Sequence, residues 1–345
     1  MAPPSQAGSD RRHSSLAPAV FAMRADLPAR LFGGNGLSRL ADLVDIDVES
    51  TITDFDQLSP VALASLEVLI TGWGSPRIGA AELEAMPRLR AIFHAAGTVK
   101  EHIAPEAWER GILVTTAADA NARPVAEYTL ATILLSGKSI PALADAYALD
   151  PGASGDYLAE IGNYRRTVGI IGASRVGRRV IHLLQQFDFT VLLYDPHMAP
   201  DDPIERLVER TGLDELFRRA TVVSVHAPLL PETVGMIGRE QFELMRPGSV
   251  LINTARAPIV DQAALTDAVR TGRLRAVLDV TDPEPLPAGD PLRSLTGVIL
   301  TPHVAGALGN ELGRLGESTL RDIELYTAGL PVEHPVTKEA LVAMA

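Results

Sequence analysis

Residues 167–195 read TVGIIGASRVGRRVIHLLQQFDFTVLLYD, and this stretch decides the fold. The apolar, β-branched run at 168–171 predicts a buried strand, and the run at 191–194 predicts the next one. Between them, a turn with two glycines leads into a segment whose apolar residues recur at helical spacing. A strand, a tight turn, a helix and a second strand form the unit from which parallel sheets are built.

The turn resembles the dinucleotide-binding fingerprint G-x-G-x-x-G, which follows a strand and opens a helix. Gly172 and Gly177 occupy its first and third positions, and Ser174 occupies the second. A Cβ at the second position crowds the approach of a pyrophosphate, although the serine hydroxyl can donate to a phosphate oxygen. Arg175 and Val176 complete the turn at the helix N-terminus, where free N–H groups and the helix dipole favour an anion.

An acidic residue follows at the distance that the fingerprint requires. Asp195 lies 195 − 172 = 23 residues after the first glycine, at the end of the second strand. A carboxylate there accepts hydrogen bonds from ribose hydroxyls and repels a 2′-phosphate, so the sequence favours NAD over NADP. The alternatives are a plain tight turn and a phosphate-binding P-loop. The P-loop fits less well because Arg178 and Arg179 stand where it has Lys and Ser/Thr.

The composition describes a globular chain long enough for two domains. It has 345 residues, of which 46% are hydrophobic and 21% are charged. The net charge of −12 argues against nucleic acid and an anionic membrane surface as partners. The absence of cysteine excludes disulfides, thiolate zinc sites and cysteine nucleophiles, and it fits a reducing compartment. The eight histidines show no metal-ligand spacing, so we expect no metal.

The N-terminus has two interpretations. Arg11 and Arg12 precede a short apolar stretch at 16–23, a pattern that loosely resembles an export signal. The stretch contains Pro18 and also fits the first strand of the fold. No apolar run approaches the ~18 residues of a membrane helix. We therefore expect a cytoplasmic protein whose residues 1–17 form a disordered tail.

Two runs of alternating strand and helix signals predict two α/β domains with parallel sheets. A long helix that begins near Pro124 is expected to connect them, and residues 149–156 are expected to form a loop. Helices are expected near 239–245 and 261–271. The predicted strands of the first run are 19–23, 68–71, 89–93 and 112–115, and those of the second are 168–171, 191–194, 222–225, 250–253, 276–280 and 298–300.

Polar side chains follow several of these strands at the point where each one ends. Arg256, Glu284 and His303 each come after an apolar stretch, as Asp195 does. The carboxyl ends of parallel strands form the edge at which an open sheet binds ligands. Taken singly, the arginine fits a surface salt bridge, the glutamate a solvated turn and the histidine a structural role. Together they indicate a redox site with a cation, an acid and an orienting carboxylate.

The chain resembles the D-isomer-specific 2-hydroxyacid dehydrogenases of the phosphoglycerate dehydrogenase type. The likeness runs from about residue 89 to 306 and is strongest over 165–306. It implies a Rossmann-like NAD-binding domain at 124–307 and a flavodoxin-like substrate domain at 18–123 plus 308–345, with a cleft between them. The stretches that carry it are TVGIIGASRVGRRV, VLLYDP, VVSVHAPLLPET, MRPGSVLINTARAPIVD, LDVTDPEPLP and TPHVAG.

The resemblance implies a role for each of three catalytic residues. Arg256 grips the substrate carboxylate in a fork and polarises the adjacent carbonyl. His303 is the general acid/base, and Glu284 orients its imidazole and keeps it protonated. The family usually has glycine after the arginine, whereas this chain has Ala257, whose methyl group either tightens the pocket or changes the loop angle.

The resemblance also implies residues for coenzyme and substrate. Asp279 holds the nicotinamide carboxamide. The backbone of Gly97 and Thr98 binds the substrate carboxylate, and Trp73 either shapes the pocket for the substrate's side chain or packs in the core. Asn121 and Glu127 are expected to be structural. Three further residues line the coenzyme site: Pro228, Thr233 and Thr254.

These expectations describe an NAD-dependent enzyme that interconverts a 2-keto acid and a D-2-hydroxy acid by direct hydride transfer. Family analogy adds a homodimer through the cofactor domain. Two alternatives stay open: a non-catalytic NAD(H)-sensing protein of the corepressor kind, which Ser174 and Ala257 would suit, and a phosphite dehydrogenase-like enzyme. A formate dehydrogenase fits less well because those enzymes place Gln where Glu284 stands. The sequence does not identify the 2-keto acid.

Overall fold

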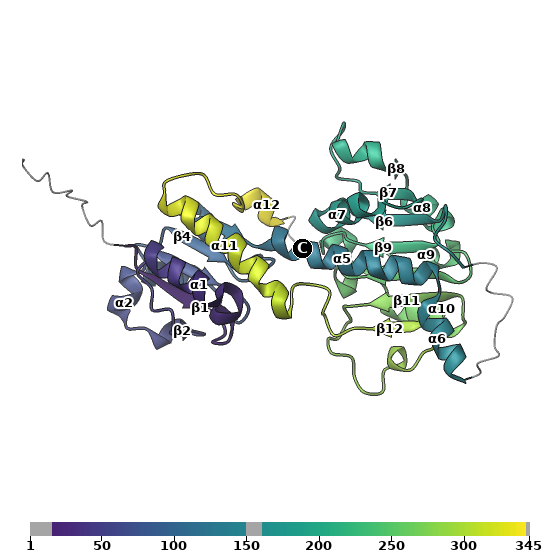
Figure 1. The fold of residues 1–345 in the computed structure, drawn as a ribbon, viewed down its shortest axis with the longest axis horizontal. Coiled ribbons are helices and arrows are strands. Elements are labelled where there is room, and N and C mark those ends of the chain that lie inside the picture. Colours follow the sequence, from purple (N-terminus) through teal and green to yellow (C-terminus); the bar gives the residue numbers. More distant parts are fainter. Residues whose placement is uncertain (1–15, 150–160, 343–345) are drawn as a thin grey trace, which may run out of the picture. The chain divides into compact units, whose positions relative to one another are not determined.

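The computed structural model describes residues 16–149 and 161–342. It divides into two compact units, Met1–Ala117 with Gly316–Lys338 and Ala118–Leu315 with Glu339–Ala345. Most of the expected N-terminal tail and of the loop expected at 149–156 lies outside the described residues. Each unit is built on one sheet whose strands pair in parallel, so the α/β prediction is confirmed (Figure 1). Assigning the units to substrate and coenzyme stays a prediction.

The second unit contains a seven-stranded sheet in the order β12-β11-β10-β9-β6-β7-β8. The chain begins this sheet at β6, in its interior, and then winds outward in both directions, which is the doubly wound arrangement. The strands are β6 (Thr167–Ile171), β7 (Thr190–Tyr194), β8 (Glu209–Arg210), β9 (Val222–Val225), β10 (Ser249–Asn253), β11 (Leu274–Leu278) and β12 (Val298–Leu300).

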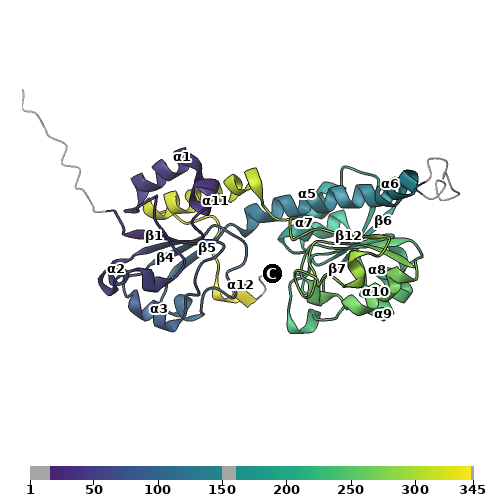
Figure 2. The same cartoon turned by 90° about the horizontal axis from the view of Figure 1, so that it is seen from below.

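Helices cover both faces of this sheet. Figure 2 shows α5, α6 and α7 on one face and α8, α9 and α10 on the other. Side chains of one strand alternate between the two cores that result. Val250 and Ile252 join the cluster under α5 and α7, whereas Leu251 joins the opposite cluster. The helices are α5 (Ala118–Gly137), α6 (Ile140–Leu149), α7 (Arg175–Leu184), α8 (Leu213–Arg219), α9 (Arg239–Leu244) and α10 (Gln262–Arg270).

The first unit contains a five-stranded sheet in the order β2-β1-β3-β4-β5. Figure 2 shows α1 and α11 on one face and α3 on the other. Its strands are β1 (Ala19–Ala22), β2 (Thr51–Ile52), β3 (Val68–Thr71), β4 (Ala91–His94) and β5 (Leu113–Thr116). Its helices are α1 (Leu27–Leu43), α2 (Pro60–Ser65), α3 (Ala80–Ala85), α4 (Glu106–Glu109) and most of α11 (Leu312–Thr327). The last helix, α12 (Lys338–Val342), belongs to the second unit except for Lys338.

The expected start of the long helix at Pro124 is wrong. Helix α5 begins at Ala118, so the proline lies inside the helix. It has no N–H to offer the preceding turn, which is why a proline normally marks a helix start. Here a tertiary contact holds the first turn of α5: Asn121 Oδ1 accepts the backbone N–H of Ala307 at 2.8 Å. Among the described helices, none is long and apolar enough to cross a membrane.

Two histidines are buried, His94 in the first unit and His226 in the second. Burial lowers the pKa of His226 to about 3, and burial together with His102 lowers the pKa of His94 to about 3. Both imidazoles therefore stay neutral in the folded protein at pH values at which the unfolded chain, with a pKa near 6.5, takes up protons. Above that value the two histidines do not lower the free energy of unfolding. As the pH falls below it, the free energy of unfolding decreases.

We expect the unfolding free energy to decrease by about 1 kcal/mol per histidine for each pH unit below about 6.5. His226→Gln should flatten this dependence, and denaturant titrations between pH 7.5 and 5.5 measure it. His182→Gln changes an exposed histidine on α7 and should leave the slope as it is. An equal slope in wild type and His226→Gln would show that His226 is protonated in the folded state.

Candidate active site

The glycine turn follows β6, the strand between β9 and β7 at which the order of the strands reverses. Gly172 has a φ of +95°, and a Cβ on it would lie 2.7 Å from the backbone N of Ala227. A Cβ on Gly177 would lie 2.0 Å from the carbonyl oxygen of Gly172. Only glycine fits either position, so the start of α7 packs directly against the turn.

Ser174, at the second position of the fingerprint, is the N-cap of α7. Its side-chain oxygen accepts the backbone N–H of Gly177 at 3.3 Å. One of the free donors of the helix N-terminus is thereby used within the protein. The hydroxyl proton remains available to a phosphate oxygen. Arg175 is exposed on the first residue of the helix, and Val176 packs against the core.

Arg178 holds the turn in place, which the sequence analysis missed. Its Nε donates to the carbonyl of Ala173 at 2.8 Å, and its two terminal nitrogens donate to the carboxylate of Asp202 at 2.7 and 2.5 Å. This bidentate contact lowers the pKa of Asp202 to about 2. The position of a basic residue directly after the third glycine was the signal available in the sequence. The neighbouring Arg179 instead pairs with Asp119 of α5.

Asp195 lies at the end of β7, beside the turn. One carboxylate oxygen accepts the N–H of Ala173 at 2.7 Å, and the other accepts the N–H of His197 at 2.8 Å. The residue lines a cavity of about 320 Å³ together with Pro228 and Thr233. The hydroxyl of Thr233 donates to the carbonyl of Pro228 at 2.8 Å and so shapes the cavity wall.

The turn that follows β10 carries Arg256. The side chain of Asn253 shapes it by accepting the N–H of Ala255 and donating to the carbonyl of Arg256, each at 3.0 Å. Asn253, which is 1% exposed, is a second residue that the sequence analysis did not single out. Ala257 starts a short 3-10 helix without a positive φ, so its methyl group does not strain the loop. Thr254 directs its hydroxyl toward α5, 3.4 Å from that of Thr129.

His303 and Glu284 meet in the structure. The imidazole Nδ1 lies 2.9 Å from Glu284 Oε1, and both side chains are about half exposed. The sequence separation of 19 residues permitted this contact without establishing it. His303 has a φ of +53°, an uncommon conformation for a residue with a side chain. The other ring nitrogen, Nε2, is thus the one that can face a substrate.

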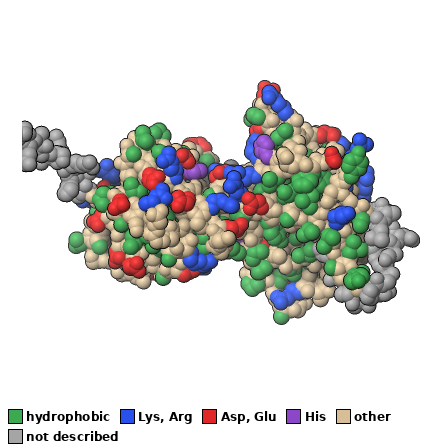
Figure 3. Space-filling model, viewed as in Figure 1, with side chains coloured by type: hydrophobic (Ala, Val, Ile, Leu, Met, Phe, Trp, Pro, Cys, Tyr) green, Lys and Arg blue, Asp and Glu red, His purple; other side chains and the backbone are tan. Residues whose placement is uncertain are grey.

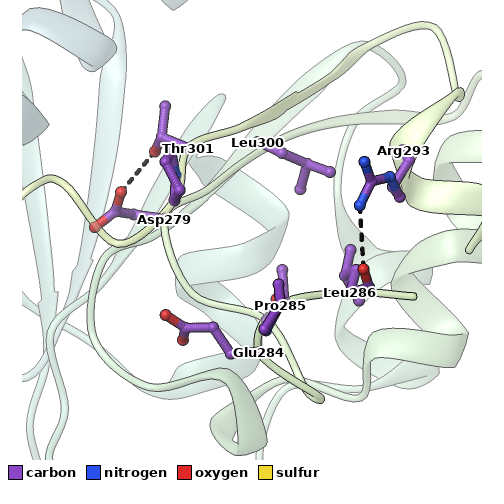
Figure 4. A pocket seen from close by; sticks show the side chains of 9 residues that line it. Asp279, Glu284, Pro285, Leu286, Arg293, Leu300 and Thr301 are labelled. Atoms are coloured by element: carbon purple, nitrogen blue, oxygen red, sulfur yellow. Dashed lines mark hydrogen bonds between the residues drawn. The ribbon is translucent and has the colours of Figure 1, made fainter. Parts of the chain in front are cut away.

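Asp279 is buried at the end of β11 and accepts three hydrogen bonds. Oδ1 accepts from Thr301 Oγ1 and from the N–H of Val304, and Oδ2 accepts from the N–H of Ala305. Only one lone pair of Oδ2 therefore remains to accept the expected hydrogen bond from a nicotinamide carboxamide. Asp279, Glu284 and Thr301 also line a cavity of about 520 Å³ whose far wall is formed by Leu286 and Arg293 (Figure 4).

The expected substrate residues of the first unit lie at the carboxyl edge of its own sheet. Gly97 and Thr98 follow β4, and the single hydroxyl proton of Thr116 is shared between the carbonyls of Ala96 and Gly97. Trp73 follows the neighbouring strand β3 and is 36% exposed. Its side chain is therefore not part of the core, which was one of its two interpretations.

The strand order and the glycine turn define the second unit as a nucleotide-binding unit of the Rossmann type. The residues fit a dinucleotide: the turn admits no side chain at Gly172 or Gly177, and Asp195 lines the adjacent cavity. A family model described as "D-isomer specific 2-hydroxyacid dehydrogenase, NAD binding domain" matches residues 133–305. The chain belongs to this family, as the resemblance predicted, and the coenzyme of the unit is NAD.

Known proteins are similar over most of this chain. A D-3-phosphoglycerate dehydrogenase of Mycobacterium tuberculosis is 34% identical over 253 residues, which are 73% of this chain and 48% of that protein. A glyoxylate reductase of Korarchaeum cryptofilum is 30% identical over 325 residues, covering 91% of this chain and 94% of that protein. A phosphoglycerate oxidoreductase structure from Rhizobium etli superposes with a TM-score of 0.80 at 26% identity, covering 94% of this chain and 99% of that one. The chain spans about half the length of the phosphoglycerate dehydrogenases that it matches.

Proposed function

We propose that this protein interconverts a 2-keto acid and a D-2-hydroxy acid with NAD as coenzyme. The single observation that carries the proposal is the 2.9 Å contact between His303 and Glu284 beside the sheet edge that holds the glycine turn. Family membership supports it, as does the relative named glyoxylate reductase, which matches nearly end to end. The phosphoglycerate dehydrogenases are named for a different acid, so the relatives do not select one substrate.

In the proposed mechanism, NADH held by the coenzyme residues named below would supply a hydride to C2 of the keto acid. Arg256 binds the substrate carboxylate and polarises the neighbouring carbonyl. Glu284 accepts a hydrogen bond from Nδ1 of His303 and so fixes the orientation of the imidazole. Nε2 then holds the proton that passes to the carbonyl oxygen, which completes the hydroxyl group. The reverse reaction moves the same proton from the hydroxyl of a D-2-hydroxy acid back to Nε2.

The proposal also assigns residues of the two units to coenzyme and substrate. The backbone of Gly97 and Thr98 binds the substrate carboxylate, and Trp73 shapes the space for the substrate's side chain. The exposed position of Trp73 supports this role. The residues proposed to hold the coenzyme are Gly172, Ser174, Arg175, Val176, Gly177, Asp195, Pro228, Thr233, Thr254 and Asp279.

The test follows NADH absorbance with a panel of 2-keto acids that includes glyoxylate, hydroxypyruvate, pyruvate and 3-phosphohydroxypyruvate. We expect turnover of at least one of them. Parallel measurements of NADH binding by fluorescence separate an enzyme from a sensor, because binding without turnover across the panel would favour the corepressor-like alternative. Reduction of NAD by phosphite in the same assay would favour the phosphite dehydrogenase-like alternative.

Asp195→Ala should relax the preference for NAD over NADP. The carboxylate repels a 2′-phosphate. Its removal also frees the N–H of Ala173, which donates a hydrogen bond to it in the wild type. We expect kcat/KM with NADPH to rise relative to that with NADH by about tenfold or more, equivalent to about 1.4 kcal/mol of discrimination. Paired kinetics with both coenzymes measure the ratio, and an unchanged ratio would contradict the assigned role.

We further propose that two copies associate through the second unit and that the protein is cytoplasmic. Leu135, Ile140 and Tyr147 of α5 and α6 are 49%, 44% and 66% exposed, and hydrophobic side chains gather over this side of the unit (Figure 3). Such a surface is typical of an interface between subunits. Sedimentation of wild type and Tyr147→Asp tests the association, since the variant should be shifted toward the monomer.

A further inference from the structure

We propose that Tyr128 and Thr301 are positioning residues that hold the His303 loop through the buried carboxylate of Asp279. The proposed link runs from α5 to the loop after β12, within the second unit. Neither Tyr128 nor Thr301 needs to touch substrate or coenzyme for this role. The effect on catalysis rests on the proposed function, whereas the effect on the loop itself does not.

The first step is the contact between Asp279 and the loop. Its carboxylate accepts the hydroxyl of Thr301 at 2.6 Å and the backbone N–H groups of Val304 at 2.8 Å and Ala305 at 2.9 Å. These donors lie on both sides of His303, whose own N–H donates to the carbonyl of Asp279 at 3.1 Å. At 2% exposure, the carboxylate has little water to replace a lost donor.

The second step is the direction of the hydrogen bonds. The Tyr128 hydroxyl lies 2.8 Å from Thr301 Oγ1, a contact in which either oxygen could donate if it stood alone. An ionised carboxylate only accepts, so the single proton of the Thr301 hydroxyl goes to Asp279. Tyr128 must therefore donate to Thr301. The chain of donors has one direction, from Tyr128 to Thr301 to Asp279, and Figure 4 shows the Thr301–Asp279 contact.

The third step is the environment of the tyrosine. Burial raises the pKa of Tyr128, the hydrogen bond with Thr301 partly offsets this, and the negative charge of Asp279 adds to the increase. The phenol therefore keeps its proton at neutral pH and serves there as a hydrogen-bond donor. The half-buried ring lies on α5, one turn along the helix from Thr132, whose hydroxyl donates to the carbonyl of Tyr128.

The consequence concerns the uncommon backbone conformation at His303. A φ of +53° persists only when the surroundings hold it in place. The donors to Asp279 hold the side chain of Thr301, two residues before His303, and the backbone of the two residues after it, and the imidazole then reaches Glu284 at 2.9 Å. A loop that loses the Thr301 hydroxyl should spend more time in conformations in which this contact is broken.

The experiment uses Tyr128→Phe and Thr301→Val, which remove one hydroxyl each, and Thr301→Ser, which keeps it. Tyr326→Phe is the matched control, since it removes a partly buried phenol in the first unit. Hydrogen exchange of the peptide covering residues 301–307 is measured first. We expect exchange to accelerate by about tenfold in Thr301→Val and by a few-fold in Tyr128→Phe, with Thr301→Ser and Tyr326→Phe close to wild type.

Kinetics provide the second measurement. We expect kcat to fall by about tenfold in Thr301→Val and less in Tyr128→Phe, with KM for NADH unchanged. The double variant should be no slower than Thr301→Val, because the tyrosine acts only through the threonine. Unchanged exchange in residues 301–307, or additive losses in the double variant, would overturn the proposal. Accelerated exchange in a protein that reduces no 2-keto acid would instead retain the positioning role and reject the proposed function.

Discussion

Replacing His303 by glutamine should lower kcat for reduction of the preferred 2-keto acid by about 10²–10⁴-fold. The amide keeps a hydrogen-bonding group of similar size but cannot deliver a proton at neutral pH. In the wild type, Nδ1 of His303 lies 2.9 Å from Glu284. The nitrogen that delivers the proton, and that the variant lacks, is therefore Nε2. Stopped-flow measurement of NADH oxidation separates the chemical step from product release.

NADH binding is the internal check on this result. The residues proposed for the coenzyme turn lie between β6 and α7 and in the first turn of α7, so the dissociation constant measured by fluorescence should stay within a few-fold of wild type. His182→Gln provides a control histidine on the exposed surface of α7, and its kcat should not change. A His303→Gln variant with more than about a tenth of wild-type kcat would exclude this imidazole as the general acid.

Gly177→Ala should abolish NADH binding and destabilise the second unit. The new Cβ would lie 2.0 Å from the carbonyl oxygen of Gly172, a distance that real Cβ contacts do not reach. Since that neighbour is backbone, α7 must move away from the turn. Overpacking of this kind costs about 1–3 kcal/mol, and the displaced helix no longer presents its N–H groups to a pyrophosphate.

The matched control is Gly289→Ala, because no atom lies within 4 Å of a Cβ at that position and its φ is not in the left-handed range. Denaturant unfolding of the two variants separates the cost of the contact from the general effect of replacing glycine by alanine. Isothermal titration with NADH then measures the loss of affinity. A Gly177→Ala protein with wild-type affinity would mean that the helix start is not part of the coenzyme site.

The strands and the glycine turn were predictable because their signals are local. A β-branched apolar run such as 168–171 indicates a buried strand without knowledge of its neighbours. Two strands were missed, β2 and β8, since each has only two residues and no apolar run. The start of α5 was placed too late because the contact between Asn121 and Ala307 joins residues 186 positions apart.

The candidate site was predictable where a motif carried it. Arg256, Glu284 and His303 were selected from the order of the motifs, and the structure adds that the last two are in contact. Asn253 was missed although its partners, Ala255 and Arg256, are close in the sequence, whereas two other missed residues have distant partners. Tyr128 reaches Thr301 over 173 positions, and Arg178 reaches Asp202 over 24. No periodicity or local spacing reports such a pair, because it exists only once the helices have packed on the sheet.

The guanidinium of Arg178 donates one hydrogen bond to the carbonyl of Ala173 in the glycine turn and two to the carboxylate of Asp202. Asp202 ends the segment that starts at Pro196 and His197, which line the cavity beside Asp195. The loops proposed to bind the pyrophosphate and the adenosine ribose are thus tied together and cannot move apart independently. A lysine, with a single point of attachment, could not make this brace.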